Sequence, residues 1–368
     1  MTATAPLGAS ESVQDATNEA DAVQSFIRRY VAMSDAQADA VTLWCCHTHA
    51  FEAAETTPYL RISSVGCGAG KTRTLEVLEL LVANPWLTGR ITGPALVRKI
   101  DQDHPTLLLD ETDALFTGGA ASQQMLRGVL NSGYRLGGKV AYAQGGSVRE
   151  LDVFCPKAFA GIGGLPGTIS DRSIPILLKK RTAFENVERL RSRTARQQAR
   201  IPRMLAARFA ATHLDALAQA RPDIPGPLDD RAADVWEPLL AIADILGGSW
   251  PSRARLAAVT LCAERKDADV ETVAFRLLTD CRRIFTDLNA KRLKTQTLLE
   301  NLLGEGWDDI DGRSLDARLL AEHLRGFGIQ PSKLRFGRQV LQGYEARSFE
   351  RAWQLVAPVV DVPEEVTR

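Results

Sequence analysis

The sequence predicts an α/β fold with a parallel sheet between two layers of helices, and three observations predict it. Apolar and β-branched residues at 59–63 precede a glycine-rich loop and then apolar residues at helical spacing, which indicates strand, loop and helix. A continuous apolar run at 106–109 ends in two carboxylates, as expected of a strand buried on both faces of a parallel sheet. Further apolar runs at 157–162 and within 168–178 supply the fourth and fifth core strands.

The glycine-rich loop has the composition of a phosphate-binding loop (P-loop). Its residues are Gly66, Gly68, Gly70, Lys71 and Thr72. In such a loop the backbone N–H groups approach phosphate oxygens, the Lys71 ammonium binds the β- and γ-phosphates, and the Thr72 hydroxyl binds Mg²⁺. The usual spacing places glycine at position 65, where this chain has Val65. ATP and Mg²⁺ are therefore the predicted ligands, and an ordinary glycine turn is the alternative.

The two carboxylates after the 106–109 run are the second part of the predicted site. Asp110 is expected to hold Mg²⁺, and Glu111 to polarise the attacking water. A strand that leaves the core through acidic residues is the alternative interpretation. The glycine loop upstream favours the nucleotide site, because both signals occur in the order that such a site requires.

A brief strand predicted at 90–92 and a helix at 94–100 separate the loop from the acidic pair. An intervening strand followed by an aspartate and a glutamate resembles the additional-strand, catalytic-glutamate division of P-loop ATPases, which includes AAA+ and RecA-like motors. The resemblance implies a P-loop NTPase of AAA+-like, three-layer architecture. Within it, Lys71 and Glu111 would be catalytic.

A β-hairpin is predicted within 137–154, where two short strand patterns flank Gly145 and Gly146. Its position resembles the pre-sensor hairpin of hexameric AAA+ helicases, which lines the central pore and grips nucleic acid. The resemblance implies that Lys139 and Arg149 contact phosphates of DNA. A plain extension of the sheet is the alternative.

Three further residues are candidates to sense or stabilise the γ-phosphate, and two of them, Arg172 and Arg231, occupy positions where AAA+ proteins place such residues. Arg172 precedes the fifth core strand, where AAA+ rings supply an arginine finger to the neighbouring subunit. Arg231 lies in the first turn of a helix at 228–245, where a lid carries its second sensor. Asn131 could serve as a polar sensor, because 161–166 lack one. Surface ion pairs are the alternative interpretation of both arginines.

The C-terminal segment resembles a winged helix. A capped helix at 314–324, a hairpin pattern at 335–344 and a final helix at 349–356 carry the resemblance. DNA binding is one use of that fold and protein contact is another. The predicted DNA-contacting residues are Lys333, Arg335 and Arg338.

These patterns predict six segments. They are a disordered lead (1–19), N-terminal helices packed on the core (20–57), a P-loop ATPase core (58–182), an α-helical lid with a basic face (183–266), a winged-helix-like domain (267–360) and a tail (361–368).

Composition narrows the functional classes. The 368 residues are 45% hydrophobic with a formal net charge of zero, so nucleic-acid contacts must come from local basic patches. Six cysteines without a CxxC pair and no signal-peptide pattern predict a cytoplasmic location, and no apolar run predicts a membrane span. We expect no zinc site at 45–49, because adjacent Cys45 and Cys46 point in different directions and no second ligand pair follows.

Together, the segments SSVGCGAGKTRTLEVLELL, LLLDETDALF, LRGVLNSGYR, DVFCPKAFAGIGGLPGTISDRSIPI and DRAADVWEPLLAIAD resemble a family of bacterial and phage P-loop proteins known only as a domain of unknown function, often found on mobile elements beside primase modules. The resemblance implies an oligomeric ATP-hydrolysing motor, a helicase or translocase in a ring such as a hexamer. It would act on DNA in replication or maintenance of a mobile element or phage, with a primase or another replication protein as partner. The alternatives are a nucleotide-switched initiator or helicase loader without processive unwinding, and a defence or signalling ATPase that recruits a protein.

Overall fold

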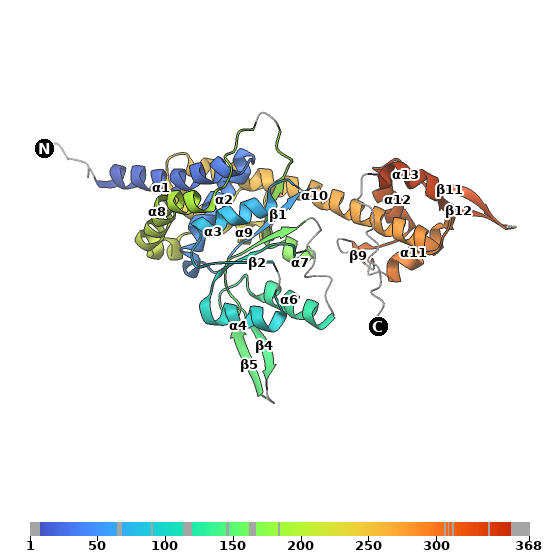
Figure 1. Ribbon diagram of the computed structural model, residues 1–368, viewed down its shortest axis with the longest axis horizontal. Helices are drawn as coiled ribbons and strands as arrows, with labels where there is room; N and C mark the ends of the chain where they lie inside the picture. Colours follow the sequence, from blue (N-terminus) through green and yellow to red (C-terminus); the bar gives the residue numbers. More distant parts are fainter. Residues whose placement is uncertain are drawn as a thin grey trace. The chain divides into compact units, whose positions relative to one another are not determined.

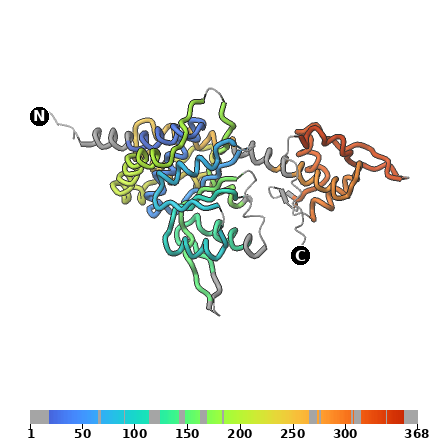
Figure 2. Tube along the Cα trace, viewed as in Figure 1, coloured from blue at the N-terminus to red at the C-terminus, as the bar shows by residue number. Residues whose placement is uncertain are grey.

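The computed structural model describes residues 8–64, 68–89, 91–112, 120–144, 147–161, 167–182, 185–304, 307, 309–310, 313–337 and 339–354. The chain divides into two compact units, residues 1–265 and 266–368 (Figures 1 and 2). The long helix α10 (Trp250–Asp287) contributes residues to both units.

A five-stranded parallel sheet forms the centre of the first unit. Its strands, in the spatial order β2-β3-β6-β1-β7, are β2 (Pro85–Thr88), β3 (Thr106–Leu109), β6 (Lys157–Gly161), β1 (Tyr59–Ser64) and β7 (Ser173–Leu178). Every neighbouring pair is parallel, so the carboxyl ends of all five strands lie at one edge. The predicted α/β class and parallel sheet are confirmed.

The prediction of a strand at 90–92 is wrong, because the second strand along the chain is β2 at Pro85–Thr88. Trp86 and Leu87 pair there with Leu107 and Leu108 of β3. A proline is tolerated at this place because β2 is an edge strand and Pro85 is its first residue, where no ladder N–H is needed.

Helices cover both faces of the sheet (Figure 1). Leu60, Ile62 and Leu108 pack on one face in a cluster with the N-terminal helices and the helices that follow β7. The N-terminal helices are α1 (Gly8–Tyr30) and α2 (Asp35–Thr48), and the helices after β7 are α8 (Ser192–Gln219), α9 (Asp230–Leu246) and the start of α10. Helix α3 (Lys71–Leu81), which follows β1, packs in the same cluster. Tyr59 and Phe159 pack on the other face against the remaining helices. These are α4 (Gly93–Asp103), α6 (Ala120–Ser132) and the short α7 (Gly167–Ser170), which contributes Ile169.

The first segment boundary differs from the prediction. Helix α1 begins at Gly8, so the predicted disordered lead is helical from there on. Glu19, the last residue of the predicted lead, is buried within α1 and accepts a hydrogen bond from Arg208 Nε at 2.6 Å. Because this partner lies far along the chain on α8, the local sequence did not indicate that the segment is ordered.

The helices predicted to form a lid belong to the same core as α1 and α2. Helix α8 lies side by side with α1 (Figure 2), and the Tyr30 hydroxyl donates to Gln198 Oε1 at 2.7 Å. Arg253 of α10 forms an ion pair with Asp39 of α2, whose side chain is largely buried. Among the described residues, 185–264 therefore form part of the helical layer on one face of the sheet.

The predicted hairpin is present as a separate two-stranded sheet. Strand β4 (Lys139–Gln144) pairs antiparallel with β5 (Ser147–Asp152). The hairpin extends beyond α4 and α6 (Figure 1), and the Asp152 backbone N–H donates to Asp101 Oδ1 of α4 at 2.7 Å. Its base is thus fixed to the helices on that face.

A buried lysine fixes the same base. Lys157 is fully buried and its Nζ donates to the backbone carbonyls of Gly133, Val153 and Cys155, at 3.0, 3.0 and 2.9 Å. Burial lowers the pKa of Lys157, while the ring of Tyr59, with its centroid 5.0 Å from Nζ, supplies a cation–π contact. The ammonium joins the end of α6, the end of the hairpin and the start of β6.

The second unit contains a three-stranded antiparallel sheet in the order β11-β12-β8. Along the chain its elements after α10 are β8 (Arg292–Lys294), α11 (Thr295–Gly304), β9 (Asp309–Ile310), β10 (Arg313–Ser314), α12 (Ala317–Arg325), β11 (Ser332–Phe336), β12 (Gln339–Glu345) and α13 (Ala346–Trp353). Tyr344, Phe349 and Leu320 are in its buried core. The predicted capped helix is present, because the Asp316 side chain accepts from the N–H groups of Arg318 and Leu319.

The cysteines and histidines at 45–49 lie in the core or bind the backbone. Cys45 and Cys46 are buried, and burial raises the pKa of Cys46 to about 12. His47 Nε2 lies 2.9 Å from Thr57 Oγ1, and His49 Nε2 lies 2.9 Å from the Leu81 carbonyl. Within the described part of the chain, no group of three or more His, Cys, Asp or Glu side chains could hold a metal ion.

Acid is expected to destabilise the first unit through His47. Burial lowers the pKa of His47 from 6.5 to about 3, so between these values the unfolded chain binds a proton that the folded chain does not. Stability therefore falls as the pH drops below 6.5, and at pH 5 the loss is about 2 kcal/mol. Urea unfolding at pH 7.5 and 5.0 measures it. His47→Gln should show a smaller difference between the two pH values; equal losses in both proteins would contradict the assignment.

Candidate functional site

The predicted phosphate loop and the helix after it lie at the carboxyl edge of the sheet. Lys71 is the first residue of α3, and its Nζ donates to Ser64 Oγ at the end of β1 at 2.6 Å. Thr72 is exposed in the first turn of α3. Gly66 and Val65 lie outside the described residues.

Two glycines of the loop have conformations that other residues rarely adopt. Gly68 has φ +79° and Gly70, the N-cap of α3, has φ +95°. Among the described residues, a Cβ at either position would meet no atom within 4 Å, so the backbone conformation is what requires glycine there. The space beside the loop is open, and the N–H groups that begin α3 have no intrahelical acceptor, which suits an anion.

The acidic pair lies at the same edge, after β3. The Asp110 backbone N–H donates to the Thr88 carbonyl at 3.0 Å, and Asp110 Oδ1 accepts from the Glu111 N–H at 2.9 Å. Glu111 is exposed and has φ +53°, a left-handed conformation that costs a residue with a Cβ about 1 kcal/mol. Backbone strain of this kind is concentrated at functional sites.

The strand order sets the distance between the loop and the acidic pair. Strand β6 lies between β3 and β1, so the ends of the two outer strands are about 10 Å apart. The Thr112 hydroxyl donates to the Ala160 carbonyl of β6 at 3.2 Å, which fixes the chain after Glu111 to the middle strand. The structure thus brings Lys71, Asp110 and Glu111 to one edge, on either side of β6.

Arg172 and Arg231 lie at the other edge, where the strands begin. The Arg172 carbonyl accepts from the N–H of Tyr59, the first residue of β1. The length of β1 separates this edge from Ser64 by about 17 Å. The structure therefore does not bring Arg172 or Arg231 to Lys71 of the same chain.

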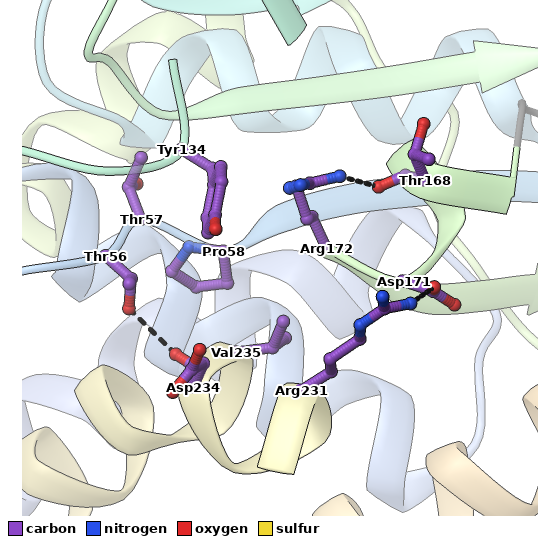
Figure 3. Close-up of a pocket in the computed structure, with 10 residues that line it drawn as sticks. All are labelled: Thr56, Thr57, Pro58, Tyr134, Thr168, Asp171, Arg172, Arg231, Asp234 and Val235. Carbon is purple, nitrogen blue, oxygen red and sulfur yellow. Dashed lines mark hydrogen bonds and ion pairs between the residues drawn. The ribbon is translucent and has the colours of Figure 1, made fainter. Parts of the chain in front are cut away.

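The two arginines line one cavity of about 80 Å³ (Figure 3). Arg231, in the first turn of α9, forms an ion pair with Asp171. The Arg172 guanidinium lies over the Tyr134 ring, 4.4 Å from its centroid, and Nη1 donates to the carbonyl of Thr168 in α7 (Gly167–Ser170). The cavity is also lined by Thr56, Thr57, Pro58, Asp234 and Val235.

Asn131 belongs to this edge as well. Its Oδ1 accepts from Arg172 Nη1 at 3.2 Å. It lies at the end of α6, away from the start of α3, so the structure does not bring Asn131 to the phosphate loop either. Residues 162–166, where a sensor would follow β6, lie outside the described residues.

The basic residues of the hairpin are exposed. Lys139 Nζ lies 3.5 Å from Glu150 Oε2, and both side chains are more than half exposed, so the pair contributes little to stability. Arg149 lies opposite Tyr142 in the ladder. The hairpin therefore presents both cations to solvent.

The second unit presents two of its three predicted residues on one face of a hairpin. Lys333 pairs with Gln342 and Arg335 with Val340, and all four residues are exposed. Lys333 and Arg335 lie two residues apart on β11, and such residues point to the same side of a strand, so the two cations share one face. Arg338 lies outside the described residues.

Sequence reasoning missed the roles of Tyr134 and Lys157 and a groove of about 380 Å³ next to the arginine cavity. The two hollows share Thr56 and Asp234. A lysine at the start of an otherwise apolar strand was the available signal for Lys157. No motif marks the groove, because its lining comes from four separate stretches of sequence, within 53–56, 135–136, 217–221 and 234–241.

A family model described as a protein of unknown function, DUF3631, matches residues 177–355. An uncharacterized 28.9 kDa protein in the xis 5′ region of Saccharopolyspora erythraea is 39% identical over 187 residues, which are 49% of this chain and 69% of that relative. The chain therefore belongs to the same family as this S. erythraea protein. The DUF3631 match begins within β7, so the phosphate loop and the acidic pair lie before it. None of the described helices is long and apolar enough to cross a membrane.

Proposed function

We propose that the chain is a Mg²⁺-dependent ATPase that acts on DNA as a homo-oligomer. One observation carries the proposal: Lys71 at the start of α3 and the acidic pair after β3 lie at the same edge of the sheet, about 10 Å apart across β6. An ordinary glycine turn or an acidic strand exit would not require this arrangement.

The residues at this edge fit a nucleotide triphosphate and its metal. The first N–H groups of α3 would receive phosphate oxygens, and Lys71 would exchange its contact with Ser64 for the β- and γ-phosphates. The Thr72 hydroxyl and the Asp110 carboxylate would hold Mg²⁺, which neutralises phosphate charge when bound. Glu111 would orient and polarise water. Most of the rate acceleration would come from positioning and electrostatic stabilisation.

The sheet topology supports an AAA+-like assignment. Strand β6 lies between β3, which Asp110 follows, and β1, which precedes the loop. This is the arrangement of the additional-strand division of P-loop ATPases. Arg172 directly precedes β7, the last core strand, on the edge away from Lys71 of its own chain. This position suits an arginine that acts on the nucleotide of a neighbouring subunit in a ring, and a hexamer is the form we propose.

Two exposed basic surfaces support DNA as the partner. The hairpin β4–β5 presents Lys139 and Arg149 beyond the body of the first unit. The second unit has the element order of a winged helix, with α10, α11 and α12 as its helices and β8, β11 and β12 as its sheet. Lys333 and Arg335 lie on its two-stranded wing.

The biological setting is part of the proposal. The family resemblance in the sequence implies a role in a cytoplasmic mobile-element or phage replication system with a primase-like partner. The S. erythraea relative is a protein in the xis 5′ region, and 69% of its length matches this chain. The proposal is therefore a motor in replication or maintenance of such an element.

ATP turnover measured without DNA, with single-stranded DNA and with duplex DNA tests the proposal. We expect magnesium-dependent turnover that DNA stimulates, and no turnover by Lys71→Ala. The double variant Lys139→Ala, Arg149→Ala should keep basal turnover and lose at least half of the stimulation, because each side chain removes a phosphate contact. Glu150→Gln in the same hairpin is the matched control and should retain the stimulation.

The same assay separates the alternatives. Strand displacement together with stimulation supports a helicase, and stimulation without displacement supports an initiator or helicase loader. No response to DNA would favour an ATPase that recruits a protein partner and would overturn the DNA part of the proposal. Turnover that is unchanged in Lys71→Ala would overturn the nucleotide site itself.

A further inference from the structure

Helix α8 presents a row of arginines on its exposed side. Pro202 and Phe209 mark its buried side, which packs in the core of the first unit. Arg193, Arg196 and Arg200 are exposed, and at 3.6 residues per turn they lie within about 60° of one another, opposite that buried side. At 1.5 Å per residue they span about 10 Å along the helix axis. We call this row the α8 arginine face.

The α8 arginine face has no carboxylate to neutralise it. Within the part of the chain that the structure describes, none of its three arginines forms an ion pair. The only acidic residues between positions 179 and 214 are Glu185 and Glu188. Glu185 accepts a hydrogen bond from the Thr182 N–H at 2.7 Å, and Glu188 pairs with Arg29 at 3.5 Å. Both carboxylates are therefore engaged away from the face.

Folding stability does not explain this concentration of charge. Many other arginines of the first unit have a carboxylate partner, namely Arg28, Arg29, Arg73, Arg135, Arg208, Arg231, Arg253 and Arg255. The first turn of α8 contains Arg193 and no acidic residue, and a cation there opposes the helix dipole. Arginines that repel one another and gain no partner within the chain indicate an anionic ligand.

The chemistry of the face fits a phosphate backbone. All three cations are guanidinium groups, whose planar donors match phosphate oxygens two at a time. Neighbouring phosphates of one strand are about 3.4 Å apart along the axis of B-DNA, so a row of about 10 Å can follow three of them. Arg189 and Arg191 are also exposed and extend the row before the helix. The Glu188 N–H donates to the Arg29 carbonyl at 2.8 Å, which holds that segment against α1.

We propose that the α8 arginine face binds the phosphate backbone of DNA without reading its sequence. The inference rests on the proposed action on DNA and adds a contact separate from the hairpin. Helix α8 packs on the face of the sheet that carries Leu60 and Leu108, whereas the base of the hairpin is fixed to α4 on the other face. The two surfaces therefore contact different stretches of DNA.

The salt dependence of DNA binding tests the proposal. The variant with Arg193→Gln, Arg196→Gln and Arg200→Gln is compared with the wild type by fluorescence anisotropy of labelled duplex DNA, between about 50 and 200 mM salt. The slope of log affinity against log salt should become shallower by about 2.7, because each lost phosphate contact removes about 0.9. Affinity at about 100 mM salt should fall at least tenfold, equally for two unrelated sequences, because phosphates carry no sequence information.

Two control variants make the result specific. Lysine at the same three positions keeps the charges and should keep the wild-type slope. Glutamine at three arginines that have carboxylate partners removes the same total charge and should change the slope by less than about 0.9. Those arginines are Arg255, Arg283 and Arg347. Urea unfolding of the α8 glutamine variant should give a midpoint equal to or above that of the wild type, since no contact within the described residues is lost.

ATP turnover separates this surface from the hairpin. The α8 glutamine variant should keep basal turnover and reach the same maximal stimulation, at a DNA concentration at least ten times higher. A wild-type slope in this variant would overturn the inference and leave the proposed function intact. So would loss of binding to poly-L-glutamate at an unchanged DNA slope, which would assign the face to an acidic protein. Failure of the wild type to bind DNA would instead overturn the DNA part of the proposed function, and the inference with it.

Discussion

Glu111→Gln is expected to bind Mg²⁺ and ATP as well as the wild type does and to hydrolyse ATP about 10²–10⁴ times more slowly. The reason is that the amide keeps the size of the side chain and loses the negative charge that polarises water. Asp110, Lys71 and the N–H groups of α3 are unchanged, so binding of a fluorescent N-methylanthraniloyl ATP analogue should be retained. Single-turnover hydrolysis separates binding from chemistry.

Two variants make this result specific. Glu264→Gln removes an equivalent charge from an exposed position on α10 and should hydrolyse ATP at the wild-type rate. Glu111→Gly removes the side chain and relieves the left-handed strain at φ +53°, so it should raise the free energy of unfolding by about 1 kcal/mol while abolishing turnover. Rapid hydrolysis by Glu111→Gln would exclude Glu111 as the group that activates water.

Lys157→Met should lower the free energy of unfolding by about 3 kcal/mol or more. The methionine fits the same volume, but three buried carbonyls at the base of the hairpin lose their donor. Release of the buried charge offsets only part of this, because the ammonium is fully hydrogen-bonded in the folded chain. Urea unfolding measures the change, and hydrogen exchange of the hairpin amides shows whether the loss is concentrated at 139–152.

The control is the same substitution at the exposed lysine of the hairpin. Lys139→Met removes only the weak contact with Glu150 and should alter stability by less than about 0.5 kcal/mol. If the two variants were equally stable, the Lys157 ammonium would not be what fixes the hairpin to the sheet.

The sequence predicted the sheet because strands buried on both faces must be apolar throughout. The runs that became β1, β3, β6 and β7 are of this kind. The edge strand β2 was misplaced because only four residues form it and its first is Pro85. The start of α1 was missed because its burial depends on α8, which no local pattern reveals.

The order of motifs along the chain also predicted that Lys71 and Asp110 would lie at one edge, since parallel strands end on the same side. The same reasoning could not place Arg231. A residue in the first turn of a helix has no strand direction to fix its edge, and its position depends on how α9 packs against α2 and α1. The cavity that it shares with Arg172 is therefore visible only in three dimensions.

The contact between α1 and α8 has a consequence for synthesis of the protein. Glu19 binds Arg208, and Tyr30 binds Gln198, so these two contacts of the first helix form only after α8 has been made, whereas its contacts with α2 can form early. At about 5–20 residues per second, the ribosome needs roughly 10–40 s to extend the chain from one helix to the other. During that interval Val23, Phe26 and Ile27, which are buried in the finished protein, have no surface of α8 to cover them. The nascent chain should therefore bind chaperones at its N-terminus until α8 emerges from the ribosome.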